Sequence, residues 1–427
     1  MIEKSKSDIN QAVLVGLHAN SLPREENATE ETMAELEALL ETAGGACVGT
    51  VLQNKQSPDS RTFIGEGKVQ EVCELVQAQS ADLVIFDNDL SPSQIRVLTQ
   101  EIGVQVMDRS GLILDIFAQR AKTREGRLQV ELAQYQYLLP RLTGMWGHLV
   151  RQTASGGKSP IGTRGPGETQ LESDRRHIRR KIAKLKEELE EVRRVRGVQR
   201  ERREKNEVPV VAIVGYTNAG KSTLLNSLTG ADIPANNRLF DTLDTTTRTL
   251  EISDTCTVLI SDTVGFIRKL PHHLVNAFKA TLEELSFADL LLHVIDVSSP
   301  EWREQAEVVE RLIGELGAQE TQRIDVFNKA DIYVGEIRPH GEDIVSVSAR
   351  TGEGLDQLLS MIGKRLDSGY HRVLLQIPYD QGGILDMLYR ETKVESVEYG
   401  DFIEVTAVCT EKILGQVTQF RVDNTAE

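Results

Sequence analysis

A glycine-rich loop with one lysine and one serine lies between a short apolar run and an amphipathic stretch. The run 208–214 predicts a strand, the loop reads GYTNAGKS, and residues 223–228 predict a helix. This order fits the pattern GxxxxGK followed by Ser or Thr. Such a loop turns backbone N–H groups toward phosphates, while Lys221 neutralises the β- and γ-phosphates and the Ser222 hydroxyl ligates Mg²⁺. The predicted nucleotide-binding residues of this loop are Gly215, Tyr216, Thr217, Asn218, Ala219, Gly220, Lys221 and Ser222.

A second motif, DxxG, follows the predicted strand 257–260. It comprises Asp262, Thr263, Val264 and Gly265. In this motif Asp262 can reach Mg²⁺ through a water molecule, and the Gly265 N–H can sense a γ-phosphate. The motif therefore belongs to the same predicted phosphate site.

A third motif, NKxD, follows the predicted strand 324–327 and comprises Asn328, Lys329, Ala330 and Asp331. The Asp331 carboxylate can accept from guanine N1–H and from its amino group, whereas adenine has no such pair of donors. ATP would leave that carboxylate unpaired. After the predicted strand 344–347, backbone groups of Ser348, Ala349 and Arg350 can cap guanine O6. Four motifs in order, each at the carboxyl end of a strand, predict a GTP-binding domain.

The first switch is less determined than the other motifs. It comprises Phe240, Asp241, Thr242, Leu243 and Asp244, and threonines continue through position 247. Any of the four threonines could supply a hydroxyl that joins Mg²⁺ only beside a γ-phosphate, and spacing does not choose among them.

Phe266 occupies the position after the DxxG glycine, where GTPases of this fold carry the glutamine that orients the attacking water. A phenyl ring cannot form that hydrogen bond. We therefore expect slow hydrolysis without a partner. The alternative is that Phe266 only packs the core of the second switch.

The first 119 residues alternate predicted strands and helices. The strands are 12–17, 46–52, 83–87 and 104–107, and the helices are 30–41, 68–79 and 92–101. This alternation predicts a small parallel sheet with crossover helices. Gly65 and Gly67 could place N–H groups on a second phosphate, but a tight turn before a helix explains them equally well.

Two apolar stripes with alternating spacings of four and three predict an antiparallel helical hairpin. The first holds Leu128, Leu132, Tyr135, Leu139, Leu142, Trp146 and Leu149, with a kink at Pro140, and the second holds Ile178, Ile182, Leu185, Leu189 and Val192. Between them, residues 156–167 are too rich in glycine and proline for a helix or strand and predict an exposed tip loop. Residues 199–207 are interpreted as a charged linker.

Charge is distributed unevenly along the chain. The net charge is -16, yet residues 120–206 hold 22 basic and 11 acidic residues. This distribution favours a phosphate-rich partner, although a basic run is often only a solvated helical face. The candidates for RNA contact are Lys158, Arg164, Arg175, Arg176, Arg179 and Arg180.

Composition excludes several classes of protein. Hydrophobic residues make up 40% and charged residues 27%, as in globular proteins. Four widely spaced cysteines indicate neither a zinc site nor a disulfide framework. The most apolar stretch, 290–297, is far too short to span a membrane, and residues 1–10 have no signal-type apolar segment. We expect a soluble, cytoplasmic protein without integral membrane contact.

The motifs resemble the HflX family of ribosome-associated GTPases. The resemblance rests on FIGEGK at 63–68, DRSGLILDIFAQ at 108–119, residues 128–134, GPGETQLESDR at 165–175, the GYTNAGKS loop and DTVGFIR at 262–268. The family pattern FATLD aligns with Phe240 to Asp244 and selects Thr242 as a magnesium ligand beside Ser222. The family carries a hydrophobic residue in place of the catalytic glutamine, and Phe266 conforms to this pattern. The predicted catalytic residues are therefore Lys221, Thr242 and Gly265. Asp241 and Thr245 depart from the family's usual alanine and proline.

The resemblance also implies an α/β architecture in several parts. We expect an N-terminal α/β domain at 1–119, a basic helical hairpin at 120–206, a P-loop GTPase domain with a mainly parallel sheet at 207–368, and a small C-terminal domain at 369–427. The last region matches no family pattern, but predicted strands at 371–377 and 402–408 around a helix at 383–389 indicate an α+β fold.

The implied function is that of a Mg²⁺-dependent GTPase that associates with the large (50S) ribosomal subunit and its rRNA. It would act as a monomer, bind GTP and GDP, split stalled or idle ribosomes under stress, and use hydrolysis for release. Two alternatives share parts of the pattern: a GTP-regulated ribosome assembly factor, and an ATP-dependent RNA-remodelling enzyme that uses the N-terminal domain as a second site.

Overall fold

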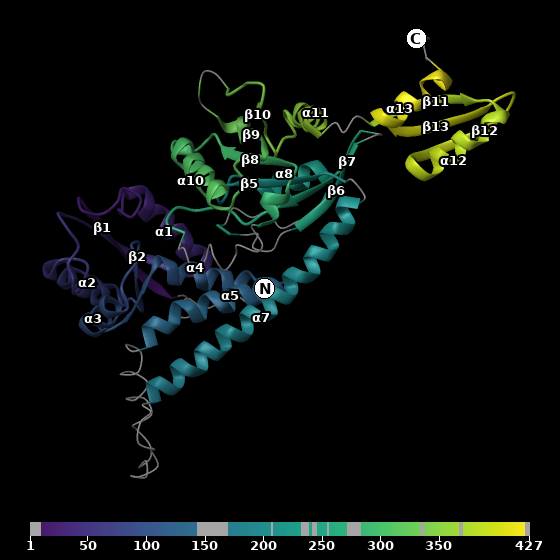
Figure 1. Ribbon diagram of the computed structural model, residues 1–427. Coiled ribbons are helices and arrows are strands. Elements are labelled where there is room, and N and C mark those ends of the chain that lie inside the picture. The colour runs from purple at the N-terminus through teal and green to yellow at the C-terminus, as the bar shows by residue number, and fades with distance from the viewer. Residues whose placement is uncertain are drawn as a thin grey trace, which may run out of the picture.

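The chain folds into an N-terminal α/β domain with a helical hairpin, a central sheet domain and a small C-terminal domain (Figure 1). This confirms the expected fold class. The computed structural model describes residues 10–142, 170–205, 208–231, 239–240, 246–253, 256–270, 283–333, 335, 338–366 and 370–422.

The N-terminal sheet is entirely parallel, with the strand order β2-β1-β3-β4. Its strands are β1 (Gln11–Ala19), β2 (Ala46–Lys55), β3 (Leu83–Phe86) and β4 (Gln105–Asp108). The helices are α1 (Glu30–Ala43), α2 (Glu66–Gln79), α3 (Pro92–Ile102) and α4 (Arg109–Arg120). The prediction of a parallel sheet with crossover helices is confirmed. Capping boxes at Thr29 and Ser91 explain why α1 and α3 begin where they do.

The hairpin pairs α5 (Arg124–Leu138) with α7 (Gln170–Lys205). Leu128 and Leu132 pack against Leu185 and Leu189, which confirms the facing apolar stripes. The two helices run antiparallel, since Arg124 approaches Glu188 while Tyr135 near the other end accepts from Lys181. Trp146, Leu149 and the tip loop 156–167 lie outside the described residues.

The sequence predicts a kink at Pro140, and the α-helix ends just before this residue. Helix α5 ends at Leu138 and a 3₁₀ turn, η2 (Leu139–Arg141), follows. Arg141 fixes this turn because it donates to the buried carboxylate of Asp108 at 2.9 Å, and Tyr137 donates to the same group at 2.8 Å. The hairpin is therefore bonded to the carboxyl end of the N-terminal sheet.

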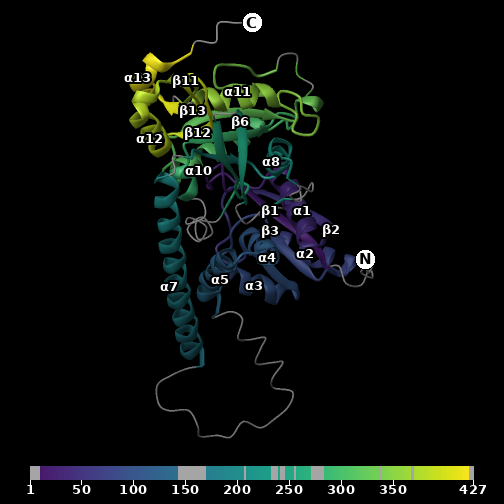
Figure 2. The ribbon, with the colours of Figure 1, turned by 90° about the vertical axis from the view of Figure 1, so that its right-hand side faces the viewer.

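Helix α7 has 36 residues and spans about 54 Å. Residues 199–205 of the predicted charged linker are helical, because α7 continues to Lys205. The segment 201–205 consists of glutamate, arginine and lysine, which favour helix once a long helix leads into them. Figures 1 and 2 show α7 running from the outer end of the hairpin to the central domain.

The central sheet has the strand order β10-β9-β8-β5-β7-β6 and is parallel except for the β6–β7 pair. Its strands are β5 (Val210–Gly215), β6 (Thr246–Ser253), β7 (Cys256–Asp262), β8 (Leu290–Asp296), β9 (Gln322–Asn328) and β10 (Ile344–Ser346). Helices α8 (Lys221–Thr229), α10 (Trp302–Glu315) and α11 (Leu355–Leu366) and the turns η3 (Glu283–Phe287) and η4 (Ala330–Ile332) complete the domain. Consequently all four motifs, which follow the parallel strands β5, β7, β9 and β10, meet at one edge of the sheet.

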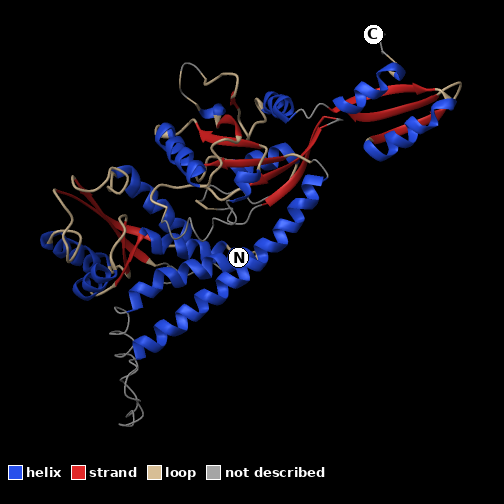
Figure 3. Ribbon diagram, in the orientation of Figure 1, coloured by secondary structure: helices blue, strands red, loops and turns tan. Residues whose placement is uncertain are grey.

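The C-terminal domain is an antiparallel sheet with two helices (Figure 3). It comprises β11 (Tyr370–Ile377), α12 (Gly382–Glu391), β12 (Lys393–Tyr399), β13 (Ile403–Thr410) and α13 (Glu411–Val417), with the turns η5 (Tyr379–Gln381) and η6 (Thr418–Phe420). The two predicted strands and the helix are present, whereas β12 and α13 were not predicted. In the part of the chain with described coordinates, no helix has the length and apolarity needed to cross a bilayer.

Candidate nucleotide site

The loop between β5 and α8, residues 215–222, is the P-loop of this chain. Gly220 caps α8 with a φ of 93°, and a Cβ atom there would lie 2.2 Å from Asn328 Nδ2. A Cβ atom at Gly215 would lie 2.3 Å from the Val294 carbonyl oxygen. Both positions therefore require glycine, because any side chain would collide with a neighbouring strand end.

Lys221 is buried and its ammonium group is held by the loop itself. Its Nζ donates to the carbonyl oxygens of Gly215 at 3.1 Å and Tyr216 at 2.8 Å. Burial lowers the pKa of Lys221 to about 8, and the negative charge of Asp262 opposes that shift. An anion beside this group would favour its charged form, which is what a phosphate-binding lysine requires.

Ser222 and Asp262 provide neighbouring oxygen atoms at the start of α8 and the end of β7. The Ser222 hydroxyl donates to Asp262 Oδ2 at 2.6 Å, and Asp262 is fully buried. A hydroxyl and a carboxylate are donors that suit Mg²⁺, so these residues fit the predicted metal. Thr242, the other predicted ligand, lies outside the described residues, as do Asp241, Leu243 and Asp244.

Asn328 connects the predicted base-binding loops to the P-loop. Its Nδ2 donates to the Ala219 carbonyl at 2.8 Å, and its Oδ1 accepts from the Ala349 N–H at 3.0 Å. Ala330 N–H donates to the Val347 carbonyl at 3.0 Å, which brings NKAD beside Ser348. The structure thus brings the sequence-predicted residues of these loops together.

Lys329 and Asp331 lie at the same edge. Lys329 adopts a φ of 64° and donates to Asp296 Oδ2 at 2.7 Å. The Asp331 side chain is 17% exposed, with Arg350 at 3.6 Å from its carboxylate. Sequence reasoning missed Asp296, although its place at the carboxyl end of β8 was a usable signal.

The second switch, residues 262–270, lies directly against the P-loop. The Thr217 N–H donates to the Phe266 carbonyl at 2.7 Å, and the Phe266 N–H donates to the Gly215 carbonyl at 3.1 Å. A Cβ atom at Gly265 would lie 3.0 Å from Lys221 Nζ. Gly265 therefore leaves no room for a side chain between the second switch and the P-loop.

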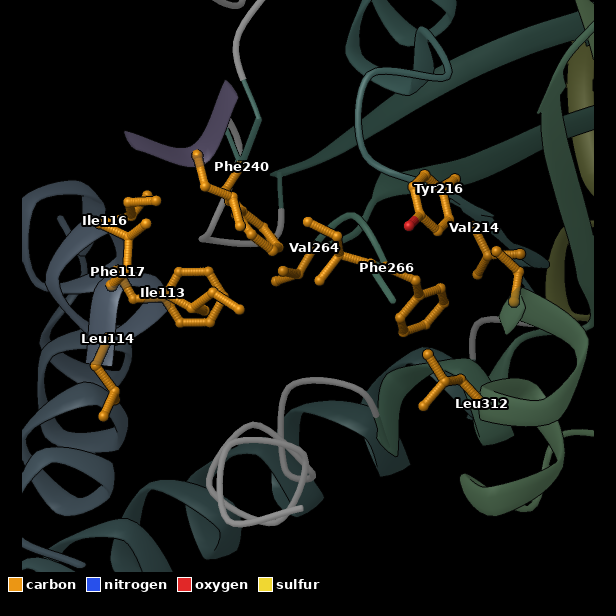
Figure 4. Close-up of a cluster of buried hydrophobic side chains, with 14 of the residues drawn as sticks. Ile113, Leu114, Ile116, Phe117, Val214, Tyr216, Phe240, Val264, Phe266 and Leu312 are labelled. Atoms are coloured by element: carbon orange, nitrogen blue, oxygen red, sulfur yellow. The ribbon is translucent and has the colours of Figure 1, made fainter. Parts of the chain in front are cut away.

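The Phe266 and Phe240 side chains are buried in an apolar cluster between the N-terminal and central domains (Figure 4). Phe240 packs edge-on against Phe117 of α4, with ring centroids 4.7 Å apart. The core-packing alternative for Phe266 thus describes its side chain correctly. The ring still presents no hydrogen-bonding group, so the expectation of slow unaided hydrolysis stays a prediction.

Four family models match consecutive parts of the chain. They are described as "GTP-binding GTPase N-terminal" (30–118), "GTP-binding GTPase Middle Region" (120–203), "50S ribosome-binding GTPase" (210–329) and "HflX C-terminal domain" (336–409). The chain is 48% identical over 421 residues to GTPase HflX of Caldanaerobacter subterraneus subsp. tengcongensis, covering 98% of this chain and 95% of that protein. It is 42% identical over 391 residues to GTPase HflX of Escherichia coli, covering 90% and 89%.

The chain belongs to the HflX family of GTPases. As an HflX-family member with a GTPase domain, it is a GTP-hydrolysing enzyme. Among solved structures, a GTP-binding protein from Sulfolobus solfataricus in complex with GDP is 25% identical, with a TM-score of 0.43, covering 84% of this chain and 99% of that one.

Four of the six residues that the sequence predicts as RNA contacts in this HflX-family chain lie in the outer half of α7. Arg176, Arg179 and Arg180 are exposed and Arg175 is half-buried. Lys181 is used within the hairpin, where it donates to the Tyr135 hydroxyl at 2.7 Å. Lys158 and Arg164 lie outside the described residues.

Proposed function

We propose that this HflX-family enzyme is a Mg²⁺-dependent GTPase that binds the 50S ribosomal subunit in its GTP form and separates stalled or idle ribosomes under stress. The observation that carries the proposal is the position of the exposed arginines on α7. They lie on the hairpin, whose outer end is far from the nucleotide edge (Figure 1). Hydrolysis then releases the subunit, and the protein acts as a cytoplasmic monomer.

The nucleotide site is proposed to work through groups that converge on one sheet edge. Lys221 neutralises phosphate charge, the P-loop N–H groups surround the phosphates, and Gly265 senses the γ-phosphate. Asp331 selects guanine through its two acceptor oxygens. Ser222 and Thr242 would hold Mg²⁺, which when bound balances phosphate charge during transfer. The carboxylate of Asp262 supports this metal position from the second motif.

Phe266 makes the ribosome a participant in turnover. Because its ring is buried and cannot orient a water molecule, the missing contact must come from the bound particle. The family model described as "50S ribosome-binding GTPase" supports the large subunit as that particle.

The hairpin is proposed to approach rRNA. Arginine binds phosphate oxygens strongly, and a helix about 54 Å long carries its charges well away from the body. The tip loop 156–167, with Lys158 and Arg164, would extend this contact. Cutting out that segment should impair splitting more than binding, because a glycine-rich sequence loses much conformational entropy when a contact orders it and so adds little net affinity.

The proposal is tested with purified protein, 50S subunits, 30S subunits and intact 70S particles. Co-sedimentation should show binding to 50S with a non-hydrolysable GTP analogue and weaker binding with GDP. Light scattering should report separation of 70S particles. Binding confined to immature subunits would instead identify an assembly factor, and ATPase activity that survives Lys221→Ala would identify a second nucleotide site.

A further inference from the structure

Four charged side chains are buried between the N-terminal domain and the second switch. Asp87 and Arg109 are at most 1% exposed, and the side chains of Glu35 and Lys269 are 16% and 11% exposed. Three come from the N-terminal domain and Lys269 comes from the second switch. Buried charges persist only when they are paired, so this cluster joins the two domains in a defined geometry.

Asp87 is the centre of the cluster. Its Oδ1 accepts from Arg109 at 2.8 Å and its Oδ2 accepts from the Thr32 hydroxyl at 2.8 Å and from Lys269. Arg109 also pairs with Glu35. The Asp87 carboxylate therefore pairs with the guanidinium group of Arg109 from its own domain and with the ammonium group of Lys269 from the second switch.

The position of Asp87 follows from the topology of the N-terminal sheet. It comes directly after β3, and β1 has β2 on one side and β3 on the other. Such a reversal of strand order opens a crevice at the carboxyl edge of a parallel sheet. In this protein Lys269 reaches that edge from the other domain.

A second connection runs from the same cluster to the P-loop. The Tyr216 hydroxyl donates to Glu35 and accepts from the Arg268 N–H at 2.8 Å. Burial and the Glu35 carboxylate raise the pKa of Tyr216 well above its usual value, so the hydroxyl remains a donor. Burial also lowers the pKa of Lys269, and the charge of Asp87 opposes that shift.

The second switch occupies the space next to the lysine of the P-loop. A Cβ atom at Gly265 would lie 3.0 Å from Lys221 Nζ and 3.0 Å from Thr217 Cα. A γ-phosphoryl group that bonds both Lys221 and the Gly265 N–H needs a hydrogen-bond length on each side of it. Lys221 has a flexible side chain, but Thr217 Cα belongs to the P-loop backbone, and the Thr217 N–H is bonded to the Phe266 carbonyl at 2.7 Å. We therefore expect the second switch to move outward to admit GTP, whereas GDP has no group at that position.

We propose that Glu35, Asp87 and Arg109 are positioning residues of the GTPase site, which hold the second switch against the P-loop and so weaken GTP binding relative to GDP. The proposal rests on the proposed phosphate roles of Lys221 and Gly265. By linkage, GTP binding must weaken the contacts of Lys269 with the N-terminal domain by the same factor. The N-terminal domain would thus respond to the γ-phosphate without touching the nucleotide.

The test measures dissociation constants of fluorescent GDP and of a non-hydrolysable GTP analogue on the full chain. Asp87→Asn and Lys269→Met should each raise the affinity for the GTP analogue relative to GDP by about fivefold or more. The double variant should shift this ratio no further than the single variants, because both remove the same contact. Glu37→Gln, on the exposed face of α1, is the matched control and should leave the ratio unchanged.

A merely structural role would change both dissociation constants equally or neither, and either result overturns the proposal. Thermal unfolding of each variant checks folding, and Lys269→Met keeps the test valid if Asp87→Asn fails to fold, since it preserves the Arg109–Asp87 pair. Lys221→Ala distinguishes failure of the proposed nucleotide site from failure of the proposed positioning role. If Lys221→Ala still binds both nucleotides as the parent does, the assignment of the phosphate site to Lys221 is refuted. If Lys221→Ala loses binding while Asp87→Asn and Lys269→Met leave the ratio of the two dissociation constants unchanged, only the positioning role is refuted.

Discussion

At the scale of single residues, the nucleotide edge depends on a few groups that each connect two loops. Asn328 bonds the P-loop on one side and Ala349 on the other. Gly220 is tightly packed on that same side chain. Because these contacts join different loops, a substitution that disturbs them should weaken nucleotide binding by displacing the loops from one another.

Replacing Asp331 with Asn should weaken GTP binding by about tenfold or more and reduce the preference for GTP over ATP. The substitution removes one acceptor oxygen and the charge that strengthens both hydrogen bonds to guanine. Competition of GTP and ATP against fluorescent GDP measures this preference. Asp356→Asn, an exposed position on α11, is the matched control. An unchanged preference in Asp331→Asn would refute the assignment of guanine recognition to this carboxylate.

Gly220→Ala should destabilise the protein by about 2 kcal/mol or more and weaken GDP binding. The new Cβ would collide with Asn328 and impose a positive φ on alanine. Gly230→Ala is a control, because Gly230 also has a positive φ, of 66°, but no neighbour within 4 Å of its Cβ position. It should cost about 1 kcal/mol and leave GDP affinity unchanged. Urea unfolding and GDP titration distinguish the two, and equal GDP affinities would show that the Asn328 contact is unimportant.

At the scale of elements, α7 combines two kinds of surface on one helix. Its apolar stripe packs on α5 and fixes its direction, while its outer half carries exposed arginines. Farther along, Arg193 and Arg194 pair with Glu190 and Glu191 at 3.0 and 2.8 Å. Within the described ranges, Arg179 and Arg180 form no such ion pair, so the two pairs of arginines can be compared directly.

Replacing Arg179 and Arg180 with Gln should weaken binding to 50S subunits and reduce the salt dependence of that binding. Two lost phosphate contacts should lower the slope of log affinity against log salt by about two. The pair Arg193→Gln and Arg194→Gln removes the same charge but should have a smaller effect, since nearby acids already neutralise it. Basal GTPase activity should stay constant in both. If the Arg179→Gln and Arg180→Gln variant binds 50S subunits with the same affinity and salt dependence as the parent, these arginines are only a solvated helical face.

At the scale of the whole molecule, the N-terminal domain and the central domain share one core. Phe117 of α4 packs on Phe240, and the same cluster includes Phe266, Val264 and Ile313. The two switches therefore contact the domain that carries the hairpin. Any particle that engages the hairpin is in a position to influence the nucleotide site through this shared core.

Hydrolysis by the isolated protein should be slow, and 50S subunits should raise it by about tenfold or more. The reason is that Phe266 cannot orient water, so the complete site forms only on the particle. Phosphate release measured with 50S, with 30S and without subunits tests this, with Lys221→Ala as the inactive control. An unaided rate equal to the rate with 50S would mean that the isolated site is already complete.

The sequence by itself determined the nucleotide motifs and most of the elements, because their signals are local. Alternating apolar runs and helical stretches marked the four N-terminal strands and three of the four helices, and stripes with fixed spacing marked the hairpin. It did not determine the contact of Lys269 with Asp87 or of Tyr216 with Glu35, since these pairs lie 182 and 181 residues apart. Only tertiary packing decides which domain covers the carboxyl edge of the N-terminal sheet, and that choice buries the charges and closes the second switch on the P-loop. The local composition also did not predict that α7 continues to Lys205. A short charged segment is not stable as a helix by itself, but a long helix that is already packed can extend into it.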